Sequence, residues 1–509
     1  MRLVPTAPAA QLAILLTVGL AARFLALLAV ARLPWFSLPD ADSALYDDMA
    51  GAFARGDWLI GTDPLRSSTY PFFLGIVYRI FGVTAWAPRV VQMVLGLLLV
   101  GLTWDTARRL MGTGSAVLAG GVVALFGPAL FYEAQLLSDA PAAALAALAL
   151  WMMVRATVQG EGRVAYWGLT GLATGAVVLL RPNAILLAIP LAAAAAWSGA
   201  ANPPYRRVVA AAIGFLIGVS PVAARNLLAT GHATVVPVYG GINLYVGNGP
   251  DATGVFNVPV DVGRAAGPQE QFTAFRAAAA RAEGHPLDAA ATDRYWIRRT
   301  LAYIADDPMR WVTLMLWKLR LFWNGRSISD IEHYEFTRDL VPVLALPLVQ
   351  WWALMPLALV GTVLAFRNRG ASAIVGIFNL TWCCSVVIFF VADRYRLPSL
   401  SGLAIAAVLA VSQITAMWRQ GSRVGQAALG SLLAAALLIA WPVGVVDNSA
   451  AMWLRLGVGY ERLGQIEEAR AAFGHAADLA PDDPQPRRAL EQLRDRRAQD
   501  PRHSGLPTR

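Results

Sequence analysis

The sequence has very little cysteine. Its two cysteines, Cys383 and Cys384, are adjacent inside an apolar segment, where they form neither a disulfide framework nor a metal site. Histidine is scarce too: His232, His285 and His333 are scattered, and no cluster of His, Cys or Asp has the spacing of metal ligands. We therefore expect neither a metal ion nor another cofactor.

Charged residues are also few. They make up 15% of the 509 residues, whereas hydrophobic residues make up 57% and the mean hydropathy is +0.51. A soluble domain carries about 25% charged residues. Apolar runs of roughly 18 residues recur along the chain and predict an all-α polytopic membrane protein. The net charge of +9 does not indicate nucleic-acid binding, because the arginines lie at the ends of apolar runs and not along one stripe.

We predict about eleven transmembrane helices. The apolar segments lie at about residues 12–31, 87–104, 114–131, 139–157, 165–180, 183–198, 208–228, 341–366, 372–392, 397–417 and 424–446. The first is too long for a signal-peptide core and has no small-residue cleavage site before Pro34, so we expect it to remain as a span. Arg23 interrupts this span. It either snorkels from a helix end or faces protein or water for a functional reason.

The arginines are distributed unevenly between the two sides of these spans. Five loops on one side carry Arg108 and Arg109, Arg155 and Arg163, Arg206 and Arg207, Arg367 and Arg369, and Arg419 and Arg423. The positive-inside rule makes that side cytoplasmic and puts the N-terminus there. An odd number of spans then places the C-terminus, and the long segment 229–340, outside the bacterial cytoplasmic membrane.

The outer side collects the acidic residues of interest. The first outer loop, Pro39–Gly51, contains four aspartates, of which Asp42 precedes Tyr46 by one helical turn. Asp139 stands at the start of the fourth span, shortly before a proline. On spacing alone both could be helix N-caps or solvated carboxylates, and a cap would still hold a carboxylate rigidly at the membrane boundary. The other aspartates of the first loop (Asp40, Asp47 and Asp48) are expected to be solvated or capping.

Four arginines lie on the outer side, against the usual charge bias: Arg181, Arg225, Arg394 and Arg396. They are either anchors to lipid headgroups or a set of hydrogen-bond donors for the phosphate of an anionic lipid. Their shared position favours the second reading.

Two further outer segments have a recognisable local character. Tyr70 precedes a proline and an amphipathic stretch, about 72–81, that suits a helix lying in the interface plane. The segment Tyr239–Gly254, which includes Asn243, is rich in glycine and permits close backbone approach. It is not a phosphate-binding P-loop, because no Gly-Lys-Ser/Thr follows.

The composition changes at about Ser449, where the chain becomes charged and alanine-rich. Residues with the spacing of a tetratricopeptide repeat are Trp453, Leu456, Gly457, Tyr460, Ala469, Phe473, Ala476 and Pro481. One repeat and a further helix, about 484–496, cannot bury an apolar face alone. We therefore expect the tail, 449–509, to pack on the outer loops or to bind a protein partner.

Several segments together, over about residues 10–420, resemble bacterial family 39-type glycosyltransferases of the GT-C superfamily, which are similar to dolichyl-phosphate-mannose protein mannosyltransferases. They are "DSALYDDMAGAFARGDW", "TYPFFLGIVYRIFG", "QLLSDAP", "LLRPNAILL", "PVAARNLLATG", "GGINLYVGN", "WKLRLFWN" and "DRYRLPSLSGLA". Each is weak alone, and their order is what carries the resemblance. The tetratricopeptide tail is a departure, because many members of the family lack it.

The resemblance implies a GT-C transmembrane domain, 1–448, with a small mixed extracytoplasmic loop region at 229–340. It implies transfer of a sugar from a polyprenyl-phosphate donor to an acceptor hydroxyl of a protein, lipid or glycan on the outer face, with inversion. Asp42 matches the family's catalytic base, and Asp139 matches a second acidic residue that orients the acceptor or assists the base. Further site candidates are Tyr46, Tyr70, Asn243 and Tyr395.

Other functions stay open at this point. A transporter or flippase of lipid-linked glycans would need charges along a transmembrane path. A non-catalytic envelope-assembly scaffold would recruit partners through the tail and tolerate loss of Asp42. A polymerase or ligase of lipid-linked oligosaccharides would share the topology and the motifs.

Overall fold

The computed structural model describes residues 7–57, 69–199, 203–230, 239–263, 268–346, 348–367, 370–420, 423–443 and 449–499. His232, Arg369 and most of the polar stretch before Tyr70 lie outside these residues.

Apolar helices form the membrane domain. They are α1 (Pro8–Val30), α5 (Trp86–Met111), α6 (Thr113–Ala124), α8 (Asp139–Gln159), α9 (Val164–Leu180), α10 (Ala188–Trp197), α11 (Pro204–Thr230), α17 (Trp351–Leu364), α18 (Ala371–Val387), α20 (Leu400–Gln420) and α21 (Arg423–Ala440). Each predicted apolar segment contains one of them. Among the described residues, five stretches are long and apolar enough to cross a membrane, namely α1, α5, α8, α11 and 393–420, and the others are shorter apolar helices. The prediction of an all-α polytopic membrane protein is confirmed.

Small residues allow close helix contacts in the bundle. A Cβ atom on Gly214 of α11 would lie 1.9 Å from the carbonyl oxygen of Gly168 of α9. A Cβ atom on Gly171 would likewise lie 2.0 Å from the carbonyl oxygen of Ala211. Glycine lets two helix backbones approach in this way, which is how helices associate where the surrounding lipid is as apolar as their side chains.

Arg23 neither snorkels nor faces a site. It is buried and forms an ion pair of 2.8 Å with Glu133 of α7 (Gly127–Glu133). It also donates to the carbonyl oxygens of Ala124 and Gly96. A buried charge pair with further hydrogen bonds to backbone carbonyl oxygens holds α1 against its neighbours and has the character of a structural element.

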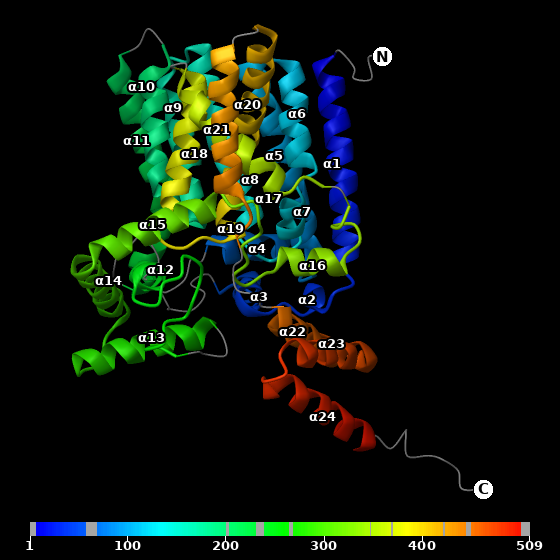
Figure 1. Cartoon of the computed structure of the whole chain (residues 1–509). Helices are drawn as coiled ribbons and strands as arrows, with labels where there is room; N and C mark the ends of the chain where they lie inside the picture. Colours follow the sequence, from blue (N-terminus) through cyan, green and yellow to red (C-terminus); the bar gives the residue numbers. More distant parts are fainter. Residues whose placement is uncertain are drawn as a thin grey trace.

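Shorter helices lie at one end of the bundle, opposite the end where the chain begins (Figure 1). They are α2 (Pro34–Ser37), α3 (Ala41–Ala54), α4 (Thr69–Phe81), α12 (Gly240–Asn248), α13 (Pro268–Glu283), α14 (Ala289–Asp306), α15 (Pro308–Phe322), α16 (Tyr334–Leu340) and α19 (Asp393–Arg396). The predicted mixed loop region is therefore helical over much of its described part. The expected amphipathic helix near 72–81 is α4, which buries Tyr70 and Leu74 and exposes Ile76 and Ile80.

The C-terminal tail consists of α22 (Ser449–Arg462), α23 (Ile466–Leu479) and α24 (Pro484–Gln499), beyond the same end (Figure 1). Phe473 packs closely on Gly457: a Cβ atom on Gly457 would lie 2.5 Å from the ring of Phe473. The tail contacts the loops at this end of the bundle, for example through the edge-to-face rings of Trp453 and Phe336, 5.2 Å apart. Packing of the tail on the loops is thus confirmed, whereas its assignment as a tetratricopeptide repeat and its binding of a protein partner stay predictions.

The orientation in the membrane can be tested with a reporter that is active only in the cytoplasm, fused after Asp447, which lies outside the described residues. We expect the fusion to be silent, because five arginine-bearing loops lie on the opposite side of an odd number of spans. A second fusion after Arg109 should be active. Activity of the first fusion would reverse the assigned side of the short helices and the tail.

Candidate functional site

Asp42 lies in the first turn of α3, just after a strained backbone position. Asp40 is the N-cap residue, and its side chain makes no capping hydrogen bond. Ala41 between them has a φ of 46°, which is unfavourable for a residue with a Cβ atom. The interpretation of Asp42 as an N-cap is therefore wrong, since Asp40 occupies that position.

Arg394 binds two carboxylates from distant parts of the chain. Its Nη1 donates to Oδ2 of Asp42 at 3.2 Å, and its Nε donates to Oδ2 of Asp330 at 2.8 Å. The side chain of Asp330 is only 2% exposed and that of Asp42 is 15% exposed. Within the described part of the chain, no group of three His, Cys, Asp or Glu residues is arranged to hold a metal ion. The arrangement joins helix α3 and the segment that contains Asp330 to the turn that follows α18.

Asp139 and Arg181 form a second buried pair next to the first. Arg181 Nη2 donates to Asp139 Oδ1, and the arginine also lies over the ring of Tyr395, 4.9 Å from its centre. Arg394 lies 5.0 Å from the same ring and donates to its hydroxyl at 3.0 Å. Asp139 is not an N-cap either, because Ser138 holds that position. Tyr395 thus connects the two arginines, and the fold brings six polar side chains together.

Two atoms of the second pair have no hydrogen-bond partner among the described residues. They are Arg181 Nε and Asp139 Oδ2, and both are buried. A buried polar atom without a partner costs free energy, about 1–3 kcal/mol. The second pair therefore keeps one unused donor and one unused acceptor among its buried atoms.

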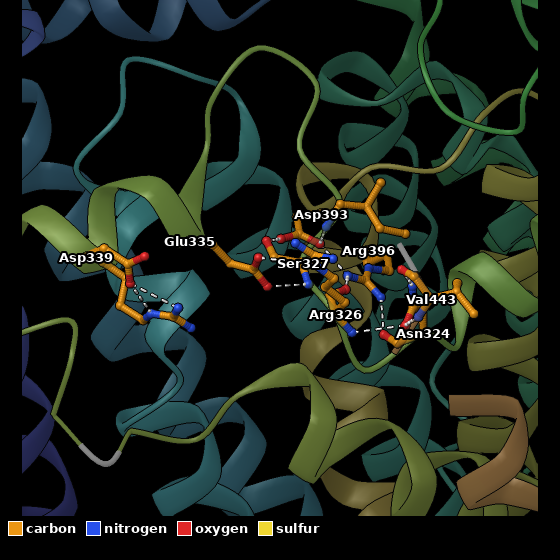
Figure 2. A network of polar contacts seen from close by, with 10 residues as sticks. Asn324, Arg326, Ser327, Glu335, Asp339, Asp393, Arg396 and Val443 are labelled. Carbon is orange, nitrogen blue, oxygen red and sulfur yellow. Dashed lines mark hydrogen bonds and ion pairs between the residues drawn. The ribbon is translucent and has the colours of Figure 1, made fainter. Parts of the chain in front are cut away.

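Arg396 points away from this cluster. Its guanidinium is fully buried, pairs with Asp393, and donates to the backbone oxygens of Asn324 and Arg326 at 2.7 and 2.9 Å (Figure 2). Asp393 in turn accepts a hydrogen bond from the Ser327 hydroxyl. Arg396 therefore fixes the turn that presents Arg394 and Tyr395, and we leave it out of the proposed phosphate site.

The tyrosines of the first loop stand beside the cluster. The rings of Tyr46 and Tyr70 meet edge to face, 5.3 Å apart, and the Tyr70 hydroxyl donates to Gln92 Oε1 at 2.8 Å. The last two candidates, Arg225 and Asn243, lie on other helices. Arg225 lies near the end of α11 and donates to Asn226 at 3.2 Å, and Asn243 lies in α12.

The remaining aspartates of the first loop differ from expectation in two of three cases. Asp47 accepts a hydrogen bond from the Tyr78 hydroxyl, and Asp40 pairs with Arg455 of the tail. Only Asp48 is exposed, as predicted for a solvated carboxylate. Asp40 does hold the N-cap position of α3, but its side chain pairs with Arg455 and makes no capping hydrogen bond. Asp47 lies within α3 and binds Tyr78, so it is neither a cap nor a freely solvated carboxylate.

Sequence reasoning missed Asp330. It stands in a polar stretch between α15 and α16 with no motif around it. The only available signal was its position: a short acidic sequence, Asp330 to Glu332, on the side predicted to face outward. That signal is shared by many solvated loop carboxylates and could not single it out.

Lys318 supports the segment that leads to Arg394. It is fully buried in α15, and its Nζ donates to Asn248 Oδ1 at 2.9 Å. The amide nitrogen of Asn248 donates to the carbonyl oxygen of Ile388, also at 2.9 Å. Burial lowers the pKa of Lys318 from 10.5 to about 7. Because the ammonium form is disfavoured, this link depends on pH.

We expect the ε-carbon resonance of Lys318 to titrate with a midpoint near pH 7. It is the only lysine of the chain, so selective ¹³C-lysine labelling gives one side-chain signal. Between about pH 7 and 10.5 the unfolded chain binds a proton that the folded protein lacks. Stability should therefore rise with pH in this window, by at most about 1.4 kcal/mol per pH unit. In Lys318→Met that contribution is absent, and a wild-type midpoint near 10.5 would contradict the burial effect.

Comparison with known proteins identifies one family. Residues 66–224, less than half of the chain, match the family described as dolichyl-phosphate-mannose-protein mannosyltransferase. No curated protein matches the chain.

Solved structures also show a likeness, at low identity. ArnT from Cupriavidus metallidurans bound to undecaprenyl phosphate is 14% identical, with 79% of this chain and 78% of that chain covered and a TM-score of 0.36. The Archaeoglobus fulgidus oligosaccharyltransferase tethered to an acceptor peptide is 13% identical, with 90% and 58% covered and a TM-score of 0.43. AglB from the same organism, in complex with an inhibitory peptide and a dolichol-phosphate, is 14% identical, with 89% and 59% covered and a TM-score of 0.40. This chain spans less than two thirds of the archaeal chains, and we take no residue role from any of these structures. The family match thus covers residues 66–224, and helices of the described residues have the length and apolar composition of membrane spans.

Proposed function

We propose that the protein transfers a sugar from a polyprenyl-phosphate donor to an acceptor hydroxyl at the outer face of the cytoplasmic membrane. The observation that carries the proposal is the cluster at one end of the bundle, where Arg394 holds Asp42 and Arg181 holds Asp139 around Tyr395. A lipid-linked substrate needs a site at the boundary of the membrane, and this cluster lies where the spans end (Figure 1).

In the proposed reaction the acceptor oxygen attacks the anomeric carbon from the side opposite the phosphate. The new carbon–oxygen bond forms as the bond to the phosphate oxygen breaks. The lipid phosphate leaves with the electron pair, and the configuration inverts. Asp42 accepts the hydroxyl proton as general base, which contributes about 10²–10⁴-fold to the rate. Asp139 orients the acceptor through its unused oxygen.

Arginine donors stabilise the charge that develops on the leaving phosphate. Arg394 and Arg181 are the arginines of the cluster, and a planar guanidinium suits a phosphate better than an ammonium group does. Each is paired with a carboxylate in this structure. Binding of a phosphate therefore redistributes hydrogen bonds that already exist, and Arg181 Nε is free of a partner among the described residues.

The charged residues buried within the spans do not favour a transporter. Arg23 and Glu133 bind each other and do not line a path.

The test has two parts. Mass spectrometry of surface glycans, glycolipids and glycoproteins in cells with and without the gene identifies the acceptor and the mass of the sugar. Purified protein in lipid nanodiscs is then given a synthetic polyprenyl-phosphate hexose or pentose and that acceptor, and released polyprenyl phosphate is measured. Release that depends on the acceptor supports the proposal. Unchanged glycans in cells and no release from any donor would contradict it.

A further inference from the structure

Arg455, in α22 of the tail, reaches two loops that are far apart in the sequence. Its Nε and Nη2 donate to the carboxylate of Asp40. Its Nη1 donates to the carbonyl oxygen of Ile331 at 2.7 Å, and its Nη2 also contacts Glu332 Oε1 at 3.2 Å. The side chain of Glu332 is 5% exposed and that of Arg455 is 21% exposed. One planar group therefore ties both loops to the tail.

Each of these loops leads directly into the candidate site. Asp40 lies two residues before Asp42, and Ile331 follows Asp330. Asp42 and Asp330 are the two carboxylates bound by Arg394. The same two loops are thus held by one arginine on the side of the site and by another on the side of the tail. Together they form a closed ring of ion pairs and backbone.

The backbone inside this ring needs such support. Ala41, between Asp40 and Asp42, has a positive φ of 46°. Residues with a Cβ atom persist in this conformation only where their surroundings hold them there. Loss of the outer contact would allow the start of α3 to relax and would move the Asp42 carboxylate.

The tail itself is fixed in place near Arg455. Trp453 packs against Phe336 of α16, with the ring centres 5.2 Å apart. Gly459 lies so close to Pro34 of α2 that a Cβ atom there would be 2.6 Å from the proline ring. The arginine therefore extends from a docked surface and not from a loose end.

We propose that Arg455 is a positioning residue of the transferase site, so that the C-terminal tail completes the site. It acts through Asp40 on the general base and through the Asp330–Glu332 segment on Arg394. The proposal rests on the proposed function for its effect on turnover. It also predicts an effect on the two loops that is independent of any reaction.

The experiment compares full-length Arg455→Met and Arg455→Lys with the wild type and with Arg470→Met. Arg470 lies in the same tail, but it pairs with Glu467 of its own helix, so it serves as the control. For Arg455→Met we expect kcat to fall about 10–100-fold, because a misplacement of about 1 Å can cost that much. The KM for the donor should stay within about threefold. Lysine should restore only part of the turnover, since it cannot contact both loops with a planar fork.

Two further measurements separate positioning from simple loss of folding. Adding Ala41→Gly to Arg455→Met should recover part of kcat, because glycine adopts a positive φ without strain. Hydrogen exchange in 38–46 and 328–333 should be faster in Arg455→Met and unchanged in Arg470→Met. Wild-type kcat per folded molecule together with unchanged exchange in Arg455→Met would overturn the proposal. If the wild type shows no transfer at all, the proposed function fails, and the exchange data alone decide the role of Arg455.

Discussion

Asp42→Asn is expected to lower turnover by about 10²–10⁴-fold, with the amount of folded protein and the binding of the donor nearly unchanged. Asparagine keeps the size of aspartate and can still accept the hydrogen bond that Arg394 donates. It cannot take up the proton of the acceptor hydroxyl. Initial rates of polyprenyl phosphate release, measured with the donor at saturation, check this result.

The matched control is Asp48→Asn in the same helix. Asp48 is exposed, so its loss should leave turnover within about twofold of the wild type, as for most surface changes. Asp40→Asn is not a suitable control, because Asp40 binds Arg455. Equal rates for the Asp42 and Asp48 variants would show that Asp42 is not the base and would direct attention to Asp139.

Arg394→Lys is expected to lower kcat/KM by about 10²-fold, mainly through weaker donor binding. Lysine keeps a positive charge beside Asp330, so the buried carboxylate is not left alone. It lacks the planar fork that can reach two carboxylates or a phosphate at once. Loss of one preorganised donor to a developing charge costs about 10²–10³-fold in comparable sites. Donor titration and steady-state kinetics measure both parts.

Arg396→Lys provides the contrast two residues away. Arg396 donates to backbone oxygens of the loop near Asn324 and is fully buried, so its substitution should reduce the yield of folded protein more than the donor affinity. If instead Arg394→Lys binds the donor as the wild type does, Arg394 is a structural ion-pair partner. The phosphate would then have to be bound by Arg181 or Arg225.

Much of the fold could be predicted from the sequence. A helix lies in or across each predicted apolar segment. The length and composition of an apolar run are local properties, and they determine whether the segment can cross a bilayer as a helix. The positions of Asp42, Asp139, Arg181 and Arg394 at one end of the bundle follow from the same alternation of spans. Helix lengths were less predictable, and several spans are shorter than expected.

The details of the site required the tertiary structure. Arg394 and Arg396 look alike in the sequence, yet one faces the cluster and the other is locked into the loop near Asn324. That distinction depends on how the short α19 turn packs. Nothing near Asp330 in the sequence indicates that it shares an arginine with Asp42.

The sequence by itself determined that this protein is a helical membrane protein, which charged residues lie at the ends of its apolar segments, and that the composition changes to a charged one at about Ser449. Those features depend on hydrophobicity and charge along the chain. The tertiary structure alone decided that Asp40 is an anchor, that Asp330 shares Arg394, and that Arg455 of the tail holds the loops behind both. Such contacts join residues that are 64 to 415 positions apart in the sequence. Their energy comes from burial and hydrogen-bond geometry that exist only after the chain has folded.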